Sequence, residues 1–229
     1  QCINIMKIYK LNYPVLFLLI FVSACSSADL SWNYDGSVTM SGKQLKTGLQ
    51  SAYSGFSNGE GVFIAGYKID NKGINHPYAV FVDNELTMRS SWKRNRKVQQ
   101  FFLYKKHTYL LDDLGRVELY ENSTWVESSI KLQSNSIIVD SNEFIIACKP
   151  TPLMKTSENI GSCYSVQKSW KVDLSWRVVK PKICDNFLVV VEDSNREIKA
   201  HRIDIDSGEI LRSISISTPV EHVCSLQFN

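Results

Sequence analysis

Cysteine is the residue type whose spacing in this 229-residue chain suggests chemistry most directly. Four cysteines lie between residues 148 and 224, and an even number in an oxidising compartment permits two disulfides. Cys148 ends one apolar run and Cys163 sits in the next, so a bridge between them would close the long insertion at 149–162. Cys184 and Cys224 follow similar runs, VVKPKIC and PVEHVC, which indicates equivalent positions on neighbouring units. Spacing leaves all three pairings open, and no CxxC or Cys/His cluster predicts a metal site.

A run of cations is the second candidate for chemistry. It consists of Lys93, Arg94, Arg96 and Lys97. A solvated loop between two strands is the favoured interpretation, and a patch that binds an anionic ligand is the alternative. If a leader containing Lys7 and Lys10 is removed, 24 of the 26 basic side chains remain against 23 acidic ones, a net charge of +1. This balance gives no argument for a nucleic-acid partner.

Other signals of catalysis are weak. No P-loop, GxGxxG or HExxH pattern occurs. The four histidines, at 76, 107, 201 and 222, are scattered, and the segment 204–208 lacks the distal Glu of an EF-hand and predicts a β-turn. A glycosidase needs carboxylates that converge on a channel, and no local motif identifies such a set. We therefore expect no cofactor, no metal and no catalytic residue.

The N-terminus predicts a targeting segment. From Met6, the expected start, Lys7 and Lys10 precede an unbroken apolar run at 15–22, followed by small residues. A positive start, a short apolar core and small residues before a cut site are the marks of a secretory signal. The run is far shorter than the roughly 20 residues that a helix needs to cross a bilayer. We expect residues 1–24 to be a signal peptide.

The junction Val22-Ser23-Ala24-Cys25 resembles the lipobox of bacterial lipoproteins. In that family the chain is cut before the cysteine, whose thiol takes a diacylglycerol and whose new amino group is acylated. The resemblance implies that Cys25 is lipidated and that the protein is held on a membrane, since three acyl chains exceed the two signals that stable anchoring needs. Ser26 stands where lipoproteins retained in the inner membrane usually carry Asp, which implies the outer membrane, facing the periplasm or the exterior. An uncleaved signal anchor is the alternative.

The body of the chain predicts an all-β fold. Runs of four to eight residues rich in Val, Ile, Phe, Tyr and Thr alternate with Asn, Asp, Ser and Gly, the pattern of strands and turns. Three successive units, at 98–129, 136–176 and 177–216, hold four such runs each, after a less regular unit at about 46–91. Four strands in about 40 residues match a β-propeller blade. We expect a propeller-like array of four to five four-stranded antiparallel blades over 46–229, with a β-sandwich as the alternative.

The segment HRIDIDSGEILRSISI, at 201–216, resembles the repeats of PQQ-type quinoprotein-like propellers. The other units lack the Gly and the outer Trp at equivalent places, so the resemblance implies a propeller fold and transfers no role. The C-terminal fragment PVEHVCSLQF predicts an incomplete fifth blade. Residues 25–45, a lipidated tether, contain the strands LSWNY and SVTMSG, which could complete that blade and close the ring.

Two functions from different classes remain. The first is a lipid-anchored, non-catalytic binding or scaffold module whose loops hold another envelope protein or a glycan. The second is a secreted hydrolase that acts on envelope or extracellular glycans. The missing motifs favour the first, since propellers often bind through loops and a fold alone implies no activity.

Overall fold

The computed structural model describes residues 3–6, 21–24, 30–149, 161–174, 177–178, 181–193, 197–217 and 223–228. In this part of the chain every regular element is a β-strand except the 3-10 helix η1 (Val223–Ser225). The chain is all-β, as the sequence predicts. Near the N-terminus β1 (Ile3–Met6) pairs antiparallel with β2 (Phe21–Ala24), and Cys25 lies outside the described residues. No described helix has the length and apolar character needed to span a bilayer.

Beyond β2 the described strands form five antiparallel sheets in chain order. The first has three strands: β3 (Ser31–Trp32), β4 (Ser37–Met40) and β5 (Lys43–Lys46). The second has four: β6 (Ser51–Ser57), β7 (Gly61–Ile69), β8 (Asn75–Asp83) and β9 (Met88–Lys93). The third also has four: β10 (Val98–Tyr104), β11 (His107–Asp112), β12 (Arg116–Glu121) and β13 (Thr124–Lys131).

The fourth sheet consists of β14 (Ile137–Asp140), β15 (Ile146–Lys149), β16 (Gly161–Ser165) and β17 (Lys171–Leu174). The fifth contains β18 (Arg177–Val178), β19 (Lys182–Cys184), β20 (Phe187–Asp193), β21 (Ile198–Asp204) and β22 (Ile210–Ile216). Both β18 and β19 pair with β20, on the same edge of the sheet. Pro181, directly before β19, has no N–H to donate to a strand ladder.

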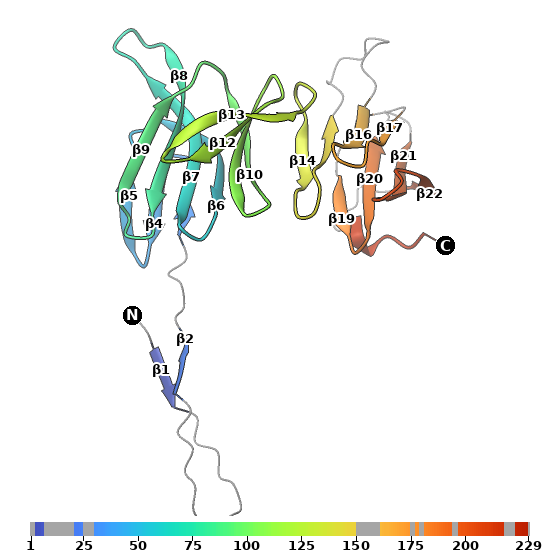
Figure 1. Cartoon of the computed structure of the whole chain (residues 1–229), viewed down its shortest axis with the longest axis horizontal. Helices are drawn as coiled ribbons and strands as arrows, with labels where there is room; N and C mark the ends of the chain where they lie inside the picture. The colour runs from blue at the N-terminus through green and yellow to red at the C-terminus, as the bar shows by residue number, and fades with distance from the viewer. Residues whose placement is uncertain are drawn as a thin grey trace, which may run out of the picture.

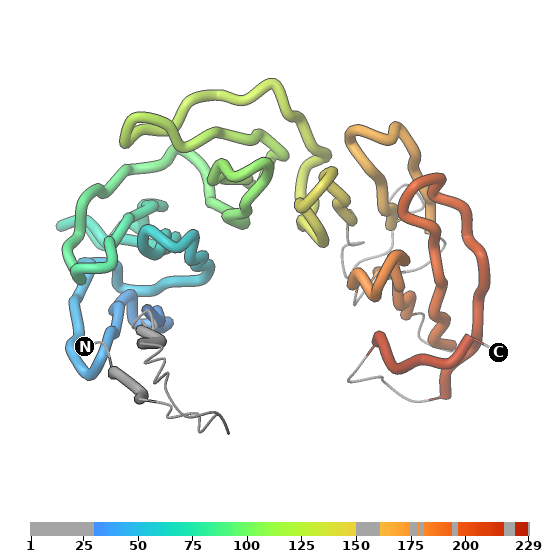
Figure 2. Tube along the Cα trace, turned by 60° about the horizontal axis from the view of Figure 1, so that its bottom comes forward, coloured from blue at the N-terminus to red at the C-terminus, as the bar shows by residue number. Residues whose placement is uncertain are grey.

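The sheets stand side by side around an arc, and the first and fifth sheets lie at its two ends without meeting (Figures 1 and 2). Each sheet is built from consecutive strands, and the predicted four-strand units correspond to the second to fifth sheets. This is the predicted β-propeller-like array, open rather than closed. A β-sandwich, which would split the strands of one unit between two sheets, is excluded.

The second strand is the most deeply buried in the second, third and fifth sheets, because both of its faces are covered, and in the fourth sheet β15 and β16 are both buried. On β20 alternate residues point to opposite sides: Val190 packs against the fourth sheet, while Val189 packs against the C-terminal segment. On β11 Leu110 contacts the second sheet and Leu111 the fourth. The uniformly apolar runs in the sequence therefore encode two-sided burial rather than a single apolar face.

Side-chain hydrogen bonds also join neighbouring sheets. The Gln100 amide on β10 accepts from Ile138 N at 2.9 Å and donates to Ile138 O at 3.2 Å, as a paired strand would do. Trp170 donates from Nε1 to the carbonyl of Ile205 at 2.9 Å, which links the fourth sheet to the fifth. Gly208 is required beside this indole, because a Cβ there would lie 2.8 Å from Trp170. Trp170 thus packs between the fourth and fifth sheets.

In several hairpins an aspartate closes the turn, because its carboxylate accepts hydrogen bonds from backbone N–H groups of the turn. The Oδ1 atom of Asp83 accepts from the N–H of Glu85 and Thr87, and that of Asp112 from Leu114 and Arg116, at 2.9–3.0 Å. The turn at 204–208 is also capped by an aspartate, since Oδ1 of Asp204 accepts from the N–H groups of Asp206 and Ser207, two and three residues ahead. The segment is therefore a turn between β21 and β22, closed by a bond from the N–H of Gly208 to the carbonyl of Asp204.

Asp70 caps the β7–β8 hairpin in the same way and has an added partner. Its Oδ2 lies 2.9 Å from Nε2 of His76, and its Oδ1 accepts from the N–H groups of Lys72 and Ile74. The hydrogen bond from His76 and then that from Ile74 lower the pKa of Asp70 to about 2. Because this folded-state pKa lies below the ordinary 3.8, any stability that it contributes is complete above pH 3.8 and is lost as the pH falls toward 2.

The ring-closing pairing suggested by the sequence is not formed in the described chain. Residues 31–46 make a sheet of their own, and Trp32, Val38 and Leu45 on one of its faces pack against the second sheet. The opposite face is polar and carries Thr39, whose hydroxyl lies 2.6 Å from that of Ser31. A polar outer face suits the end of a stacked array in contact with water. The array therefore begins at residue 31 rather than 46, and its first sheet is an end cap.

Candidate functional site

A hollow of about 340 Å³ opens between the second and third sheets. Its walls come from the end of β9 and the following loop, from the β11–β12 turn, and from β12 and β13. They consist of Lys93, Arg94, Asn95, Arg96, Asp112, Arg116, Glu118, Trp125 and Glu127. Three of the four cations of the sequence run, the alternative anionic-ligand patch, are thus brought together here. The fourth, Lys97, is not; its Nζ lies 4.9 Å from the centre of the Tyr53 ring.

Strand alternation places the wall formed by β12 and β13. Glu118 lies opposite Glu127, and Tyr120 lies opposite Trp125, so the four side chains share one face of the third sheet. Val117 and Leu119, on either side of Glu118 on β12, point the other way and pack in the cluster shared with the fourth sheet. This period of two turns the side chains of Glu118 and Glu127 toward the hollow.

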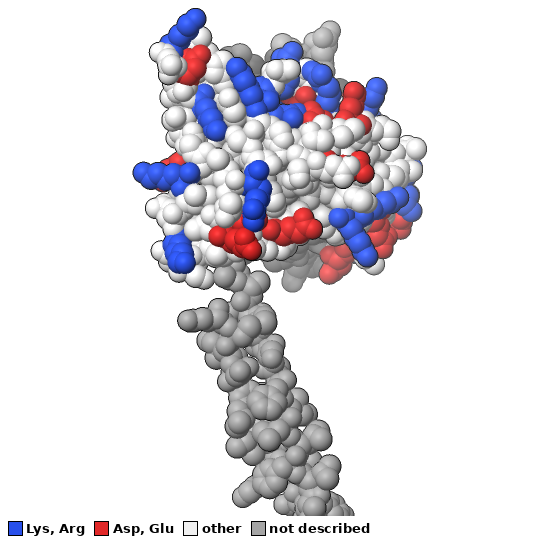
Figure 3. Space-filling model, turned by 60° about the vertical axis from the view of Figure 1, so that its left-hand side comes forward, with Lys and Arg blue, Asp and Glu red and all other residues white. Residues whose placement is uncertain are grey.

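The electrostatics of the hollow are mixed. Nη2 of Arg94 donates to Oε1 of Glu118, with side chains only 16% and 23% exposed, and Arg116 lies 3.4 Å from Asp112. Lys93 and Arg96 are exposed and form no ion pair with the described residues. Four cations therefore face three carboxylates, a local net charge of +1. Figure 3 shows a similar mixture on one face of the molecule, where both signs of charge surround a broad uncharged area.

Aromatic packing holds the inner wall in place. The ring of Trp125 lies 5.8 Å from that of Trp92, 5.1 Å from Tyr120 and 5.6 Å from Phe63. Such clustered rings gain more than their buried area alone provides. The buried Nε1 of Trp125 has no hydrogen-bond acceptor among the described residues. The hollow thus combines a rigid aromatic base with a fixed ion pair and two unpaired cations at its rim.

Both disulfides are present, which selects one of the three pairings left open by the sequence. Cys148–Cys163 joins directly opposite residues of β15 and β16, and both cysteines are fully buried. Cys184–Cys224 connects the end of β19 to η1. The described residues contain no group of His, Cys, Asp and Glu able to hold a metal ion.

Residues 55–59 (GFSNG) form a Gly-x-Ser-x-Gly pattern, which is not among the motifs considered above. In esterases this pattern is a strand-to-helix turn that exposes the serine. Here Ser57 ends β6 and the chain continues into β7, so the segment is a hairpin. Gly55 has a packing role instead, because a Cβ at this position would collide with the indole of Trp32.

A buried polar row on the fifth sheet was also not anticipated. His201 places Nε2 2.9 Å from Oε2 of Glu192 and Nδ1 2.7 Å from Oγ of Ser213, and both His201 and Glu192 are buried. In a serine hydrolase the serine contacts Nε2 and the carboxylate contacts Nδ1, the reverse of this arrangement. The three residues lie on adjacent strands β20, β21 and β22. We therefore infer that their hydrogen bonds fix the register of these strands and hold the strands together. The available signal in the sequence was Glu192, which breaks the apolar run FLVVV of β20.

No protein-family model and no curated protein matches the sequence. Among solved structures the chain is similar to the computationally designed Ika8 protein, with 13% identity over 81% of this chain and 70% of that one and a TM-score of 0.44. It is also similar to dihydro-heme d1 dehydrogenase NirN in complex with DHE, with 11% identity over 82% of this chain and a TM-score of 0.44. The chain spans about half of NirN, 54% of its length. We take no function from either similarity.

Proposed function

We propose that this protein is a lipid-anchored, non-catalytic binding module of the bacterial outer membrane, facing the periplasm or the exterior. It holds an envelope protein or a glycan in the hollow between the second and third sheets. The observation that carries this proposal is the hollow itself, in which Lys93 and Arg96 are unpaired at the rim above a fixed Arg94–Glu118 pair. Its volume of about 340 Å³ falls within the range of ligand sites.

The chemistry of the walls narrows the class of ligand. Unpaired Lys and Arg side chains favour a carboxylate or phosphate group on the ligand. Arg94 and Glu118, already bonded to each other, lose little side-chain entropy when a ligand arrives and offer further donor and acceptor positions. An acidic peptide segment of an envelope protein and an acidic glycan both meet these requirements.

The proposed anchor sets where the hollow operates. Six peptide steps separate Cys25 from Ser31, the first residue of β3. Fully extended, they reach about 20 Å. A lipid on Cys25 would therefore keep the first sheet close to the membrane surface, and the ligand is expected to belong to that surface or to lie next to it.

The anchor is tested by replacing Cys25 with Ser. Without the thiol no diacylglycerol can be attached, so the variant should accumulate as an unlipidated precursor. Metabolic labelling with a radioactive fatty acid and partition between aqueous and detergent phases measure the result. Normal processing and detergent partition of the variant would contradict the lipid anchor.

The hollow is tested with a double charge reversal, K93E/R96E. The assay uses a soluble form in which residues 1–25 are replaced by a cleavable secretion signal, because the lipid itself binds membranes. Cosedimentation with envelopes from cells that lack the gene should show saturable binding by the unmodified body. We expect the variant to bind at least about tenfold more weakly, a loss of about 1.4 kcal/mol.

The matched control is K43E/K46E, which changes the net charge equally on the exposed strand β5 of the first sheet. It should bind as the unmodified body does. Equal weakening by both variants would show nonspecific charge attraction and would overturn the assignment of the hollow. Release of soluble sugar from the envelopes by the unmodified body would instead support the hydrolase.

A further inference from the structure

The outer face of the fifth sheet is apolar and is covered by the end of the chain. Val189, Val191 and Ala200 on this face are at most 4% exposed. They pack against the C-terminal segment, residues 223–228, through Val223, Leu226 and Phe228. The segment belongs to no sheet, and in Figure 1 it runs beside the fifth sheet to the C-terminus. This face of the fifth sheet is therefore covered by a segment that belongs to no described sheet.

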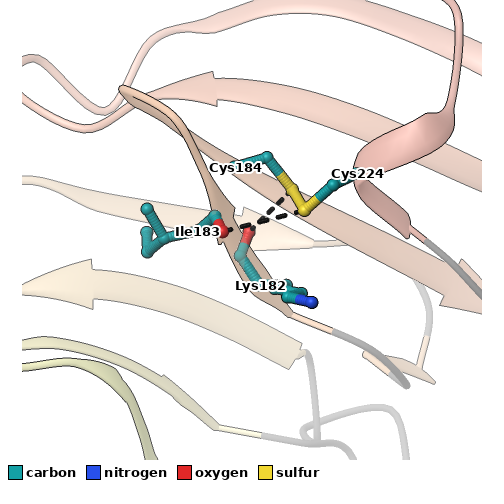
Figure 4. Close-up of a disulfide and its surroundings, with 4 residues drawn as sticks. All are labelled: Lys182, Ile183, Cys184 and Cys224. Carbon is teal, nitrogen blue, oxygen red and sulfur yellow. Dashed lines mark hydrogen bonds between the residues drawn. A yellow bond between two sulfur atoms is a disulfide. The ribbon is translucent and has the colours of Figure 1, made fainter. Parts of the chain in front are cut away.

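A surface disulfide fastens this cap. Cys184 at the end of β19 is bonded to Cys224 in η1, 40 residues later (Figure 4). Cys224 is exposed and Cys184 half-buried, whereas Cys148 and Cys163 are both fully buried. Thiol–disulfide exchange requires direct access of a thiolate to sulfur, so the two bridges differ sharply in accessibility to a reductant.

The surroundings of the surface bridge suit attack by a thiolate. A hollow of about 200 Å³ lies beside it, and Cys184, Cys224 and Arg202 are among its lining residues. The guanidinium of Arg202 is held 3.5 Å from the centre of the Phe187 ring. A fixed cation near the bridge favours an incoming thiolate over a neutral thiol.

The reduced state also has hydrogen-bond acceptors in place. Sγ of Cys184 lies 3.9 Å from the carbonyl oxygen of Lys182, and Sγ of Cys224 lies 3.8 Å from that of Ile183 (Figure 4). A disulfide sulfur carries no proton, so these contacts are not hydrogen bonds in the oxidised chain. After reduction each S–H can donate weakly to the carbonyl that already faces it. Each S–H group formed by reduction of the bridge therefore has an acceptor.

We propose that Cys184–Cys224 is a reducible clasp that a dithiol opens to release the C-terminal segment from the fifth sheet. A thiolate of the dithiol attacks Sγ of Cys224, forms a mixed disulfide and expels Cys184 as a thiolate, which takes a proton. The second thiol of the dithiol then displaces Cys224. The dithiol gives two electrons and two protons and becomes a disulfide, and the chain gains two thiols.

Release uncovers the apolar face that the segment occupied. After reduction the segment is held by non-covalent contacts, among them those of Val223, Leu226 and Phe228. This device is independent of the hollow between the second and third sheets, which lies elsewhere in the array.

The test exposes the full-length chain in detergent to dithiothreitol under native conditions, with alkylation of free thiols and peptide mass mapping over time. Cys184 and Cys224 should become alkylated at least about 100-fold faster than Cys148 and Cys163. Fluorescence of an apolar dye should rise at the same rate, while near-ultraviolet circular dichroism is retained. A C184S/C224S variant should bind the dye without reductant and show no further rise.

Two outcomes overturn the clasp. If all four cysteines become reactive together, the surface bridge opens only through global unfolding. If Cys184 and Cys224 are alkylated without a rise in dye fluorescence, the segment stays in place and the bridge controls nothing.

Discussion

Replacement of Val190 by Asp is expected to prevent the fifth sheet from packing and to lower the free energy of unfolding by at least about 4 kcal/mol. Val190 is fully buried on β20 and packs against the fourth sheet. Its cross-strand neighbour is His201, whose ring nitrogens already face Glu192 and Ser213. An aspartate at 190 would therefore be buried, unpaired and close to another carboxylate.

Urea unfolding followed by circular dichroism measures this effect, and two variants make it specific. Val190→Ala removes volume without charge and should cost about 2 kcal/mol. Asn186→Asp adds the same charge in the exposed turn before β20 and should change stability by less than about 0.5 kcal/mol. A Val190→Asp variant as stable as Asn186→Asp would contradict two-sided burial of this strand. Ser194, the turn position that the sequence suggests as a control, lies outside the described residues.

Replacement of Phe63 by Ala is expected to lower the free energy of unfolding by about 3–5 kcal/mol, because it leaves a cavity at the interface between the second and third sheets. Phe63 is fully buried on β7, and its ring lies 4.6 Å from that of Phe81 on its own sheet. It also contacts rings of the third sheet, with Tyr120 at 4.9 Å and Trp125 at 5.6 Å. The loss should therefore be felt across the interface between the second and third sheets.

The measurement is again urea unfolding, with tryptophan fluorescence as a second probe. Tyr34→Ala is the control, because Tyr34 is 79% exposed and its removal should change stability by less than about 0.5 kcal/mol. If Phe63→Ala unfolds at the same urea concentration as this control, the aromatic cluster does not hold the two sheets together.

The repeat of the sheets could be predicted from the sequence because its physical causes are local. Runs such as FIIAC and FLVVV are apolar at every position, which a strand tolerates only when both faces are covered. The Asp turns that separate the runs were equally visible, because a carboxylate bonds to N–H groups two and four residues ahead. Local pattern therefore predicted the four-strand units and their order.

Closure of the array could not be predicted in this way. The strands at 31–46 have the composition of the other strands, and only their register shows that Trp32, Val38 and Leu45 share one face while Thr39 shares the other with Ser31. That register makes the first sheet an end cap. The C-terminal fragment has a similar ambiguity, since its apolar residues suit either a strand or a segment laid across a sheet.

The candidate hollow was predictable only in part. Lys93, Arg94 and Arg96 are adjacent in the sequence, so the charge run was apparent. The other charged wall residues Asp112, Arg116 and Glu118 come from the next sheet, and no local pattern indicates that Glu118 neutralises Arg94. The run of cations therefore contributes three members to a mixed-charge hollow, where Lys93 and Arg96 form no ion pair with the described residues.

Protection of lysines in the presence of envelopes tests the proposed binding site most directly. The soluble body, with and without envelopes from cells that lack the gene, is treated briefly with an amine-reactive label, and each lysine is quantified by mass spectrometry. Lys93, at the rim of the hollow, should react several-fold more slowly when envelopes are present, while Lys43 and Lys46 on the first sheet should react at unchanged rates. Protection of Lys43 and Lys46 with Lys93 unchanged would contradict binding through the hollow.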